Sequence, residues 1–140
     1  MTYFEVVVDY SGTPLSLKLG VKANSSLVLV HAPRTFSLDV EASVTVSRGG
    51  KGPSDVVLAF FTSASKYEEE LDVVSRLITP SGGLWIAWPK KASGRRTTMS
   101  DHVVRDVALA TGLVDNKVCA IDITWTGLRL VWRLDRRGHL

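Results

Sequence analysis

Three short stretches of the sequence, residues 27–30, 55–61 and 84–88, are apolar at nearly every position. Strands that are apolar on both faces are typical of parallel sheets covered by helices. Between the second and third stretches, Tyr67, Leu71, Val74 and Ile78 repeat at helical spacing. Strands that alternate with helices pair in parallel through right-handed crossovers. The sequence therefore predicts an α/β fold with a mostly parallel sheet.

Capping residues predict where the helices begin and end. Ser65 and Glu68 form a capping-box pattern, which would put Glu68, Glu69 and Glu70 in the first turn of the helix. Pro80 and the Gly82-Gly83 pair are expected to stop that helix.

Two further helices are expected. Thr98 and Asp101 would cap one of them, Val103, Val104, Val107 and Ala108 would face inward, and Gly112 would end it. Near the start of the chain, Thr13 would cap a short helix with Pro14 in its first position and Gly20 at its end.

The remaining segments complete the sheet. Residues 44–46 predict a short strand, and Val6, Val7 and Val8 could be an edge strand or a loose lead-in. Two alternating strands close the chain, one with Cys119, Ile121, Ile123 and Trp125 on a face, the other with Leu128, Leu130, Trp132 and Leu134. Thr126-Gly127 is expected to be the tight turn between them. We expect a single domain over residues 1–140, with a lead-in at 1–9 and a basic tail at 135–140.

Composition limits the classes of protein to which the chain can belong. Hydrophobic residues make up 45% and charged residues 22% of its 140 residues, which is ordinary for a globular protein. Apolar runs stay far below the roughly 20 residues of a membrane-spanning helix, and the N-terminus lacks the features of a signal peptide. The single cysteine, Cys119, excludes an intramolecular disulfide and a cysteine-based zinc site. These features favour the cytoplasm and argue against a membrane partner.

The order of elements resembles a known fold. Strand, helix, strand, helix and hairpin over residues 55–134 resemble the second half of the class I methyltransferase fold, in which the last strand folds back antiparallel. The segment 33–43 leaves little room for a full helix, so the resemblance implies an abbreviated Rossmann-like sheet.

Several sequence blocks resemble a narrower family. They are Tyr10-Ser11-Gly12-Thr13-Pro14-Leu15, Lys18-Leu19-Gly20, Trp88-Pro89-Lys90-Lys91-Ala92-Ser93, Gly112-Leu113-Val114-Asp115, Lys117-Val118-Cys119-Ala120, Thr124-Trp125 and Gly127-Leu128. In this order, they are similar to the bacterial family called domain of unknown function 3052. That family has an acidic residue between Asp122 and Thr124, where this chain has Ile123. The resemblance implies a fold and a bacterial origin, and no activity.

Motifs for cofactors, phosphate and metals are weak. The first strand runs into His31-Ala32-Pro33-Arg34 instead of a glycine-rich turn, and Arg48 stands where an acidic ribose partner would be expected. We therefore expect no S-adenosylmethionine binding and no other cofactor. Gly49-Gly50-Lys51-Gly52 lacks the P-loop spacing and predicts an ordinary turn. His31, His102 and His139 have no metal-ligand spacing. His31 could be a base or ligand, but a hydrogen-bonded structural role is favoured, and no residue is assigned to catalysis.

Topology predicts one candidate site. Ligands of open α/β sheets bind outside the carboxyl ends of the strands. There the sequence places His31, Arg34, Arg48, Lys51, Thr62, Ser63, Trp88, Lys90, Lys91 and Ser93. Cationic, hydroxyl and tryptophan side chains suit an anionic small molecule or an acidic protein surface.

Three functions remain open at this point. The first is a non-catalytic binding or regulatory module with an anion-preferring crevice. The second is a small enzyme or cofactor binder, a degenerate methyltransferase-like protein that uses the same crevice. The third is nucleic-acid binding: residues 90–140 hold 10 basic and 5 acidic groups, against 7 and 9 in residues 1–89. Without a groove-reading element, nucleic acid is the least favoured partner.

Overall fold

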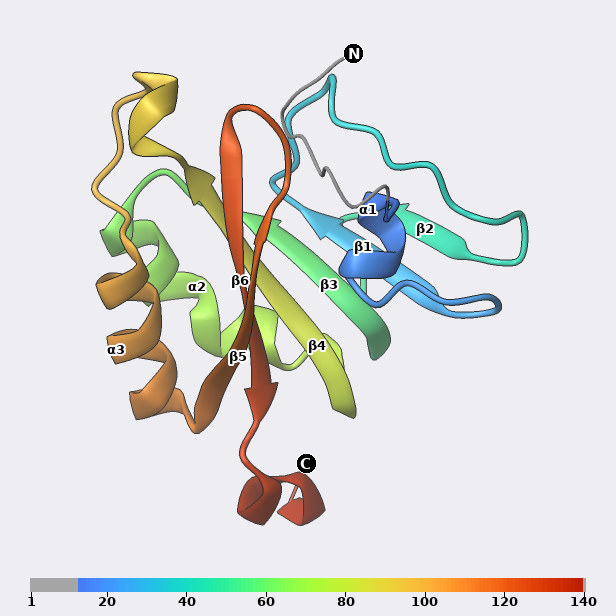
Figure 1. Ribbon diagram of the computed structural model, residues 1–140. Helices are drawn as coiled ribbons and strands as arrows, with labels where there is room; N and C mark the ends of the chain where they lie inside the picture. Colours follow the sequence, from blue (N-terminus) through green and yellow to red (C-terminus); the bar gives the residue numbers. More distant parts are fainter. Residues whose placement is uncertain (1–12, 140) are drawn as a thin grey trace.

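The computed structural model describes residues 13–139, so the predicted segment Val6–Val8 lies outside the described residues. The described residues form a six-stranded sheet with helices packed against it (Figure 1). The elements in chain order are α1 (Leu15–Lys18), β1 (Ser26–Val30), β2 (Thr45–Arg48), β3 (Ser54–Phe60), α2 (Ala64–Ser75), β4 (Ile78–Pro89), the 3₁₀ helix η1 (Lys91–Ser93), α3 (Asp101–Thr111), β5 (Leu113–Ala120), β6 (Trp125–Trp132) and the 3₁₀ helix η2 (Leu134–His139).

The strand order is β2-β1-β3-β4-β6-β5. β1 pairs in parallel with β2 and β3, and β3 pairs in parallel with β4. β6 alone is antiparallel to both of its neighbours, β4 and β5. The α/β sheet is therefore mostly parallel and ends in an antiparallel hairpin, as the sequence predicts. Residues 31–44 form no helix, which agrees with the expected shortening of the first half.

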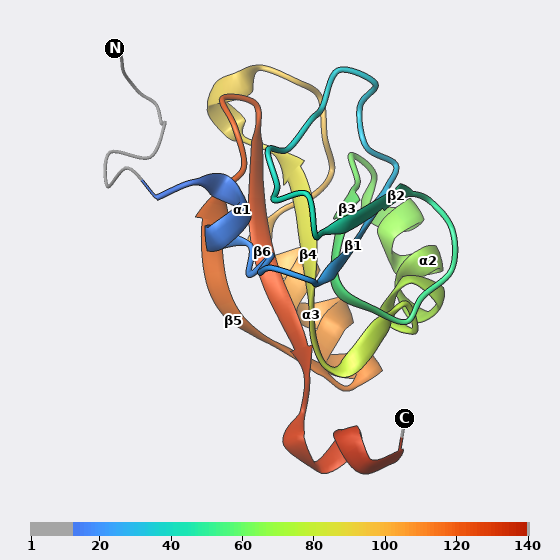
Figure 2. The same cartoon turned by 90° about the vertical axis from the view of Figure 1, so that its right-hand side faces the viewer.

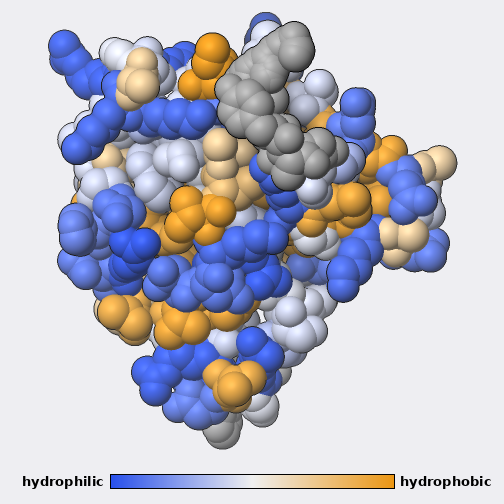
Figure 3. Space-filling model, viewed as in Figure 1, coloured by the Kyte–Doolittle hydropathy of each residue, from blue (hydrophilic) through white to orange (hydrophobic). Residues whose placement is uncertain are grey.

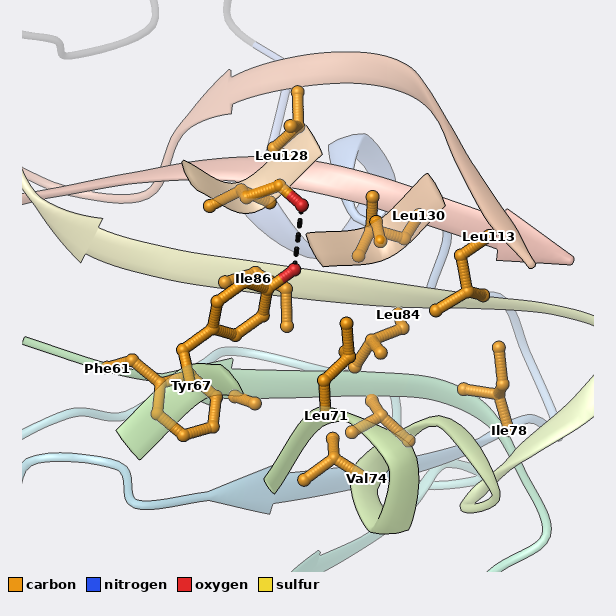
Figure 4. Packing of buried hydrophobic residues seen from close by; sticks show 14 of the residues in the cluster. Phe61, Tyr67, Leu71, Val74, Ile78, Leu84, Ile86, Leu113, Leu128 and Leu130 are labelled. Atoms are coloured by element: carbon orange, nitrogen blue, oxygen red, sulfur yellow. Dashed lines mark hydrogen bonds between the residues drawn. The ribbon is translucent and has the colours of Figure 1, made fainter. Parts of the chain in front are cut away.

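Both faces of the sheet are buried. On one face, α2 and α3 cover a core that includes Leu71, Val104 and Leu128 (Figures 1 and 4). The hydroxyl of Tyr67 on α2 donates a 2.8 Å hydrogen bond to the carbonyl of Val104 on α3, so it also joins the two helices. On the other face, α1 lies close to the sheet (Figure 2), and the indole Nε1 of Trp85 donates to the carbonyl of Leu19 at 2.9 Å. Burial on both faces explains why the strands are apolar throughout.

The helices begin at residues other than the predicted caps. Ser63, not Ser65, caps α2 by accepting a 3.3 Å hydrogen bond from the Lys66 backbone N–H. The first turn of α2 therefore holds no acidic residue, and the expected placement of Glu68–Glu70 there is wrong. Ser100, not Thr98 or Asp101, caps α3 through the Val103 N–H. Gly112 ends α3 at φ +97°, as predicted.

The short first helix is also displaced slightly. Pro14 occupies its N-cap position, so Thr13 is not the cap and Pro14 is not the first helical residue. Gly20 follows the end of α1 with φ +86°, as expected. β2 covers Thr45–Arg48 where residues 44–46 were predicted.

Pro80, Gly82 and Gly83 do not stop α2, because α2 ends at Ser75 and β4 already begins at Ile78. Both glycines serve close approaches inside the sheet. A Cβ at Gly82 would lie 2.8 Å from the Asp55 carbonyl oxygen, and one at Gly83 would lie 2.4 Å from Nε of Arg129. Glycine commonly ends a helix, but at these two positions its missing side chain makes room for neighbouring atoms.

The final hairpin turns earlier than predicted. β5 ends at Ala120, and β6 begins at Trp125, so Ile123 lies in the connecting loop at 84% exposure and Trp125 belongs to the second strand. Gly127 is not a turn residue: it pairs with Ala87 on one side and Cys119 on the other. Leu134 is exposed in η2 and does not continue the buried face of β6. The expected basic tail is folded as η2, in which Nε of Arg137 donates to the Trp132 carbonyl.

Candidate functional site

The carboxyl ends of β1, β2, β3 and β4 lie at one edge of the sheet, at the top of Figure 1. The chain leaves β1 toward β2 on one side and returns with β3 on the other side. The strand order therefore reverses between β1 and β3. In open α/β sheets a ligand crevice forms outside such a switch point.

The ten predicted crevice residues all lie at or after these strand ends, but they spread along the edge. His31 and Arg34 follow β1, Arg48 and Lys51 lie at and after the end of β2, Thr62 and Ser63 follow β3, and Trp88, Lys90, Lys91 and Ser93 lie at and after the end of β4. With about 4.8 Å between neighbouring strands, the ends of β2 and β4 are separated by three strand spacings. Lys51 is thus not brought next to Lys90 and Lys91.

Five of these residues have local structural tasks. Arg48 donates to the carbonyls of Pro33 (3.3 Å) and Phe36, and so fastens the loop after β1. The Thr62 carbonyl accepts from the Thr97 hydroxyl at 2.7 Å. The other three are Ser63, which caps α2, Ser93, whose hydroxyl donates to the Lys90 carbonyl, and Trp88, which is 8% exposed in the core.

Four cationic side chains at this edge form no ion pair with another described residue. Arg34, Lys51 and Lys91 are exposed and Lys90 is half-buried. Within residues 13–139, the ion pairs involve other side chains and none of these four. They make the edge basic, but no ion pair among the described residues holds them in one arrangement.

His31 lies directly at the switch point. Its backbone adopts φ +56°, a left-handed conformation that is uncommon for a residue with a Cβ. Its Nε2 lies 2.7 Å from Oε1 of Glu70 on α2, and its ring meets Phe61 edge-on with the centroids 5.5 Å apart. The hydrogen bond from His31, together with the charges of His31 and Lys66, lowers the pKa of the Glu70 carboxyl, although burial opposes the shift. His31 is therefore hydrogen-bonded, as a structural histidine would be, and its role stays a prediction.

The turn after β1 does not fit S-adenosylmethionine, the cofactor of methyltransferases. His31 carries a bulky ring where a glycine would leave the backbone accessible. Pro33 has no N–H to donate, and its carbonyl is taken by Arg48. At the end of β2 the side chain is this same arginine, where a ribose hydroxyl would need an acceptor.

A hollow of about 320 Å³ opens at the same edge, on the sheet face opposite α2 and α3. Its wall comes from the loop after β1, the loop after η1 and the hairpin loop before β6. The lining residues are Pro33, Thr35, Phe36, Arg95, Asp122, Thr124 and Trp125.

Two aromatic residues that line this hollow, Phe36 and Trp125, pack against a third ring behind the wall. Phe60 lies between Phe36 and Trp125, with edge-to-face centroid distances of 5.1 and 5.0 Å. The guanidinium of Arg95 lies over the Trp125 ring, 5.7 Å from its centroid. A stacked cation beside a rigid aromatic wall can bind a flat anionic group.

Hydrogen bonds fix the hairpin loop of the hollow. Oδ1 of Asp122 accepts from the backbone N–H groups of Thr124 and Trp125, both at 2.8 Å. The Lys90 N–H donates to the Thr124 carbonyl at 2.8 Å, so the predicted basic segment after β4 adjoins this loop. Sequence reasoning missed Asp122 and Trp125 because it placed the turn at Thr126-Gly127, and it missed Arg95 because its partner Trp125 is distant in the sequence. The available signal was Asp122 itself, because an aspartate often starts a turn by accepting a hydrogen bond from the backbone N–H two residues later.

Comparisons with solved structures identify the fold. Magnesium protoporphyrin IX methyltransferase of Synechocystis with bound SAM matches with a TM-score of 0.56 at 8% identity, covering 85% of this chain and 74% of that one. The chain has a methyltransferase-like fold. Similar matches are the 1,6-didemethyltoxoflavin-N1-methyltransferase of Burkholderia thailandensis (TM-score 0.55, 11% identity, 83% and 73% covered) and the fibrillarin pre-rRNA processing protein of Methanococcus jannaschii (0.53, 11%, 86% and 69%).

The sequence comparisons add no family. No family model matches the chain, and no curated protein matches it. The resemblance to domain of unknown function 3052 therefore stays a prediction. At these identities the solved structures establish the fold and leave the function to the site.

Exposed hydrophobic side chains occur on several elements of the described residues. Large exposed hydrophobic side chains come from separate elements, and Figure 3 shows hydrophobic areas interspersed with hydrophilic ones. They are Leu17, Val46, Val73, Leu109, Val118, Ile123 and Leu134. None of the helices within residues 13–139 combines the length and apolar character needed to cross a membrane.

Proposed function

We propose that the protein is a small-molecule binder on a degenerate methyltransferase-like scaffold, and that it binds a flat, negatively charged molecule in the hollow beside Trp125. The observation that carries the proposal is the guanidinium of Arg95 held over the Trp125 ring, at the mouth of a 320 Å³ hollow at the carboxyl edge. The volume is at the small end of the range of ligand pockets, about 300–1,000 Å³.

The chemistry of the lining supports a ligand with two distinct parts. Trp125 is 6% exposed and packs against the ring of Phe60, so it adds a small, rigid apolar part to a mostly polar wall. Arg95 supplies a planar fork that suits a carboxylate or phosphate. The hydroxyls of Thr35 and Thr124 can orient polar substituents.

The predicted basic residues support the sign of the ligand's charge. Lys90 and Lys91 follow β4, and the Lys90 backbone is bonded to the hairpin loop of the hollow. Two neighbouring ammonium groups without a carboxylate partner among the described residues raise the local concentration of anions. This supports binding of an anionic small molecule more than binding of an acidic protein surface, because the hollow is concave and small.

The test uses adenosine monophosphate and salicylate as probes, an aromatic phosphate and an aromatic carboxylate. Titration is followed by the indole N–H signals in nitrogen-correlated NMR spectra. The Trp125 signal should shift saturably, while that of Trp85, whose indole is buried and bonded to the Leu19 carbonyl, should stay in place. Unchanged Trp125 signals with both probes would contradict the proposal.

A matched pair of variants locates the binding group. Arg95→Met keeps the stem over Trp125 and removes the charge, and it should weaken binding about tenfold, the effect of one charge-assisted contact. Arg96→Met removes the same charge from the adjacent exposed position and should leave the affinity nearly unchanged. Equal losses in both variants would show general electrostatic attraction and not a site.

A further inference from the structure

A second hollow lies at the opposite edge of the sheet, where β1, β3 and β4 begin. Its volume is about 420 Å³. The polar side chains on its wall are Lys22, Asn24, Ser25, Asp55, Thr79, Ser81 and Arg129. In Figure 1 this edge is at the bottom, where η2 also lies. The hollow is therefore separate from the crevice at the carboxyl ends.

Arg129 is seated in this wall by the sheet itself. It lies on β6 opposite Trp85 of β4, and its guanidinium passes over Gly83. A Cβ at Gly83 would come within 2.4 Å of Nε and 2.8 Å of Nη2. The glycine thus provides the space that the guanidinium occupies, and the half-buried side chain is held in a defined place.

Most hydrogen-bonding capacity of this guanidinium is unused. It has five N–H donors, and its hydrogen bond within the described part of the chain is from Nη1 to Oδ1 of Asn116 at 3.4 Å. No ion pair between residues 13 and 139 includes Arg129. A half-buried charge without a carboxylate partner is unusual, because desolvation is then not compensated.

Burial and a neighbouring positive charge both disfavour the charged form of Arg129. Burial lowers the pKa of Arg129, and the positive charge of Arg137 on η2 lowers it further. Asp55 is the carboxylate on the wall, but its Oδ2 already accepts from the backbone N–H of Ser26 at 2.9 Å and from the Ser26 hydroxyl at 3.2 Å. An anion bound to Arg129 in the hollow would offset the repulsion that Arg129 experiences from Arg137.

We propose that this hollow is a binding site for the oxyanion group of a small molecule, a phosphate or a carboxylate, with the Arg129 guanidinium as its principal ligand. The planar fork binds either group through two parallel hydrogen bonds. The ammonium of Lys22 adds a second cation, and the hydroxyls of Thr79 and Ser81 add neutral donors. The volume leaves room for more than a bare ion.

The experiment titrates the full chain with inorganic pyrophosphate in one arm and citrate in the other. Binding is followed by calorimetry and by the Nε–H signal of Arg129 in NMR spectra. A saturable shift of that signal at millimolar concentration or below supports the site, and the arm with the higher affinity identifies phosphate or carboxylate as the preferred group. No shift in either arm overturns the proposal.

Two variants act on the same atoms in different ways. Arg129→Met removes the charge and should weaken binding at least tenfold. Gly83→Ala keeps the charge, but its Cβ would displace the guanidinium of Arg129. This variant should weaken binding severalfold while its circular dichroism spectrum stays that of the wild type. Arg96→Met, with the same loss of charge at the other edge, should bind as the wild type. If Arg129→Met folds, equal affinities in all four proteins overturn the proposal. If it does not fold, equal affinities of the wild type and Gly83→Ala overturn it.

Discussion

The imidazole Nε2 of His31 lies 2.7 Å from the Oε1 atom of Glu70, across 39 residues of sequence. This contact ties the turn after β1 to the second turn of α2, at the point where the strand order of the sheet reverses. His31 combines it with a left-handed backbone at φ +56°. Such strain persists where the surrounding contacts over-determine the conformation.

Two substitutions at His31 should separate backbone strain from side-chain contacts. His31→Ala and His31→Gly both lose the contacts with Glu70 and Phe61. Only alanine keeps a Cβ in the left-handed region, which costs roughly 1–2 kcal/mol per residue. We therefore expect His31→Gly to be more stable than His31→Ala by about 1 kcal/mol in urea denaturation. Equal unfolding free energies would show that the turn relaxes out of this conformation.

Glu70 should make stability depend on pH in the acid range. Its pKa is lowered in the folded protein from the usual value of 4.5, first by the hydrogen bond from His31. A lowered folded-state pKa adds stability that is complete above the unfolded value and is lost as pH falls through the folded value. Glu70→Gln should thus be less stable than the wild type at neutral pH, by about 0.5–1 kcal/mol, and this gap should close below pH 4.5.

The control for this comparison is Glu69→Gln, on the exposed side of the same helix. It removes the same charge without touching His31, so its difference from the wild type should be small and nearly constant with pH. Denaturation curves at neutral and acid pH measure both differences. A gap for Glu70→Gln that does not narrow in acid would mean that the carboxylate contact contributes nothing to folding.

The elements that the sequence predicts well are those whose local pattern and burial agree. β1 and β3 are apolar on both faces and are buried on both faces. Gly112 lies where a helix with an apolar face must end, and its positive φ is a local requirement. In each case one segment alone carries the signal.

The errors arise where a residue serves a distant neighbour. Gly83 makes room for Arg129 and does not end a helix. A Cβ at Gly127 would lie 3.0–3.3 Å from atoms of Ile121, and this glycine does not mark a turn. Nothing within a few residues of either position indicates this. The candidate site has the same limit: the strand ends predict His31 and Lys90 at one edge, but the stacking of Arg95 on Trp125 joins a loop residue to the first residue of β6.

S-adenosylmethionine is expected not to bind appreciably. The cofactor needs a glycine-rich turn with free backbone N–H donors after the first strand. Here that turn has the ring of His31 and lacks the N–H of Pro33, and Arg48 donates hydrogen bonds to the carbonyls of Pro33 and Phe36. Calorimetry with millimolar cofactor should show no saturable heat. Binding in the micromolar range would contradict this expectation.

Lys90 and Lys91 should contribute to anion binding at the carboxyl edge without contributing to stability. Lys91 is exposed, and the Lys90 contact with Thr124 uses the backbone N–H, which alanine retains. The double variant Lys90→Ala/Lys91→Ala should keep the melting temperature nearly unchanged, weaken adenosine monophosphate binding severalfold and flatten its salt dependence, because two screened charges are lost. Arg76→Ala/Arg133→Ala is the matched control: it removes two exposed cations that are each paired with an aspartate. If the lysine variant binds as tightly as this control at every salt concentration, the lysines play no part in the site.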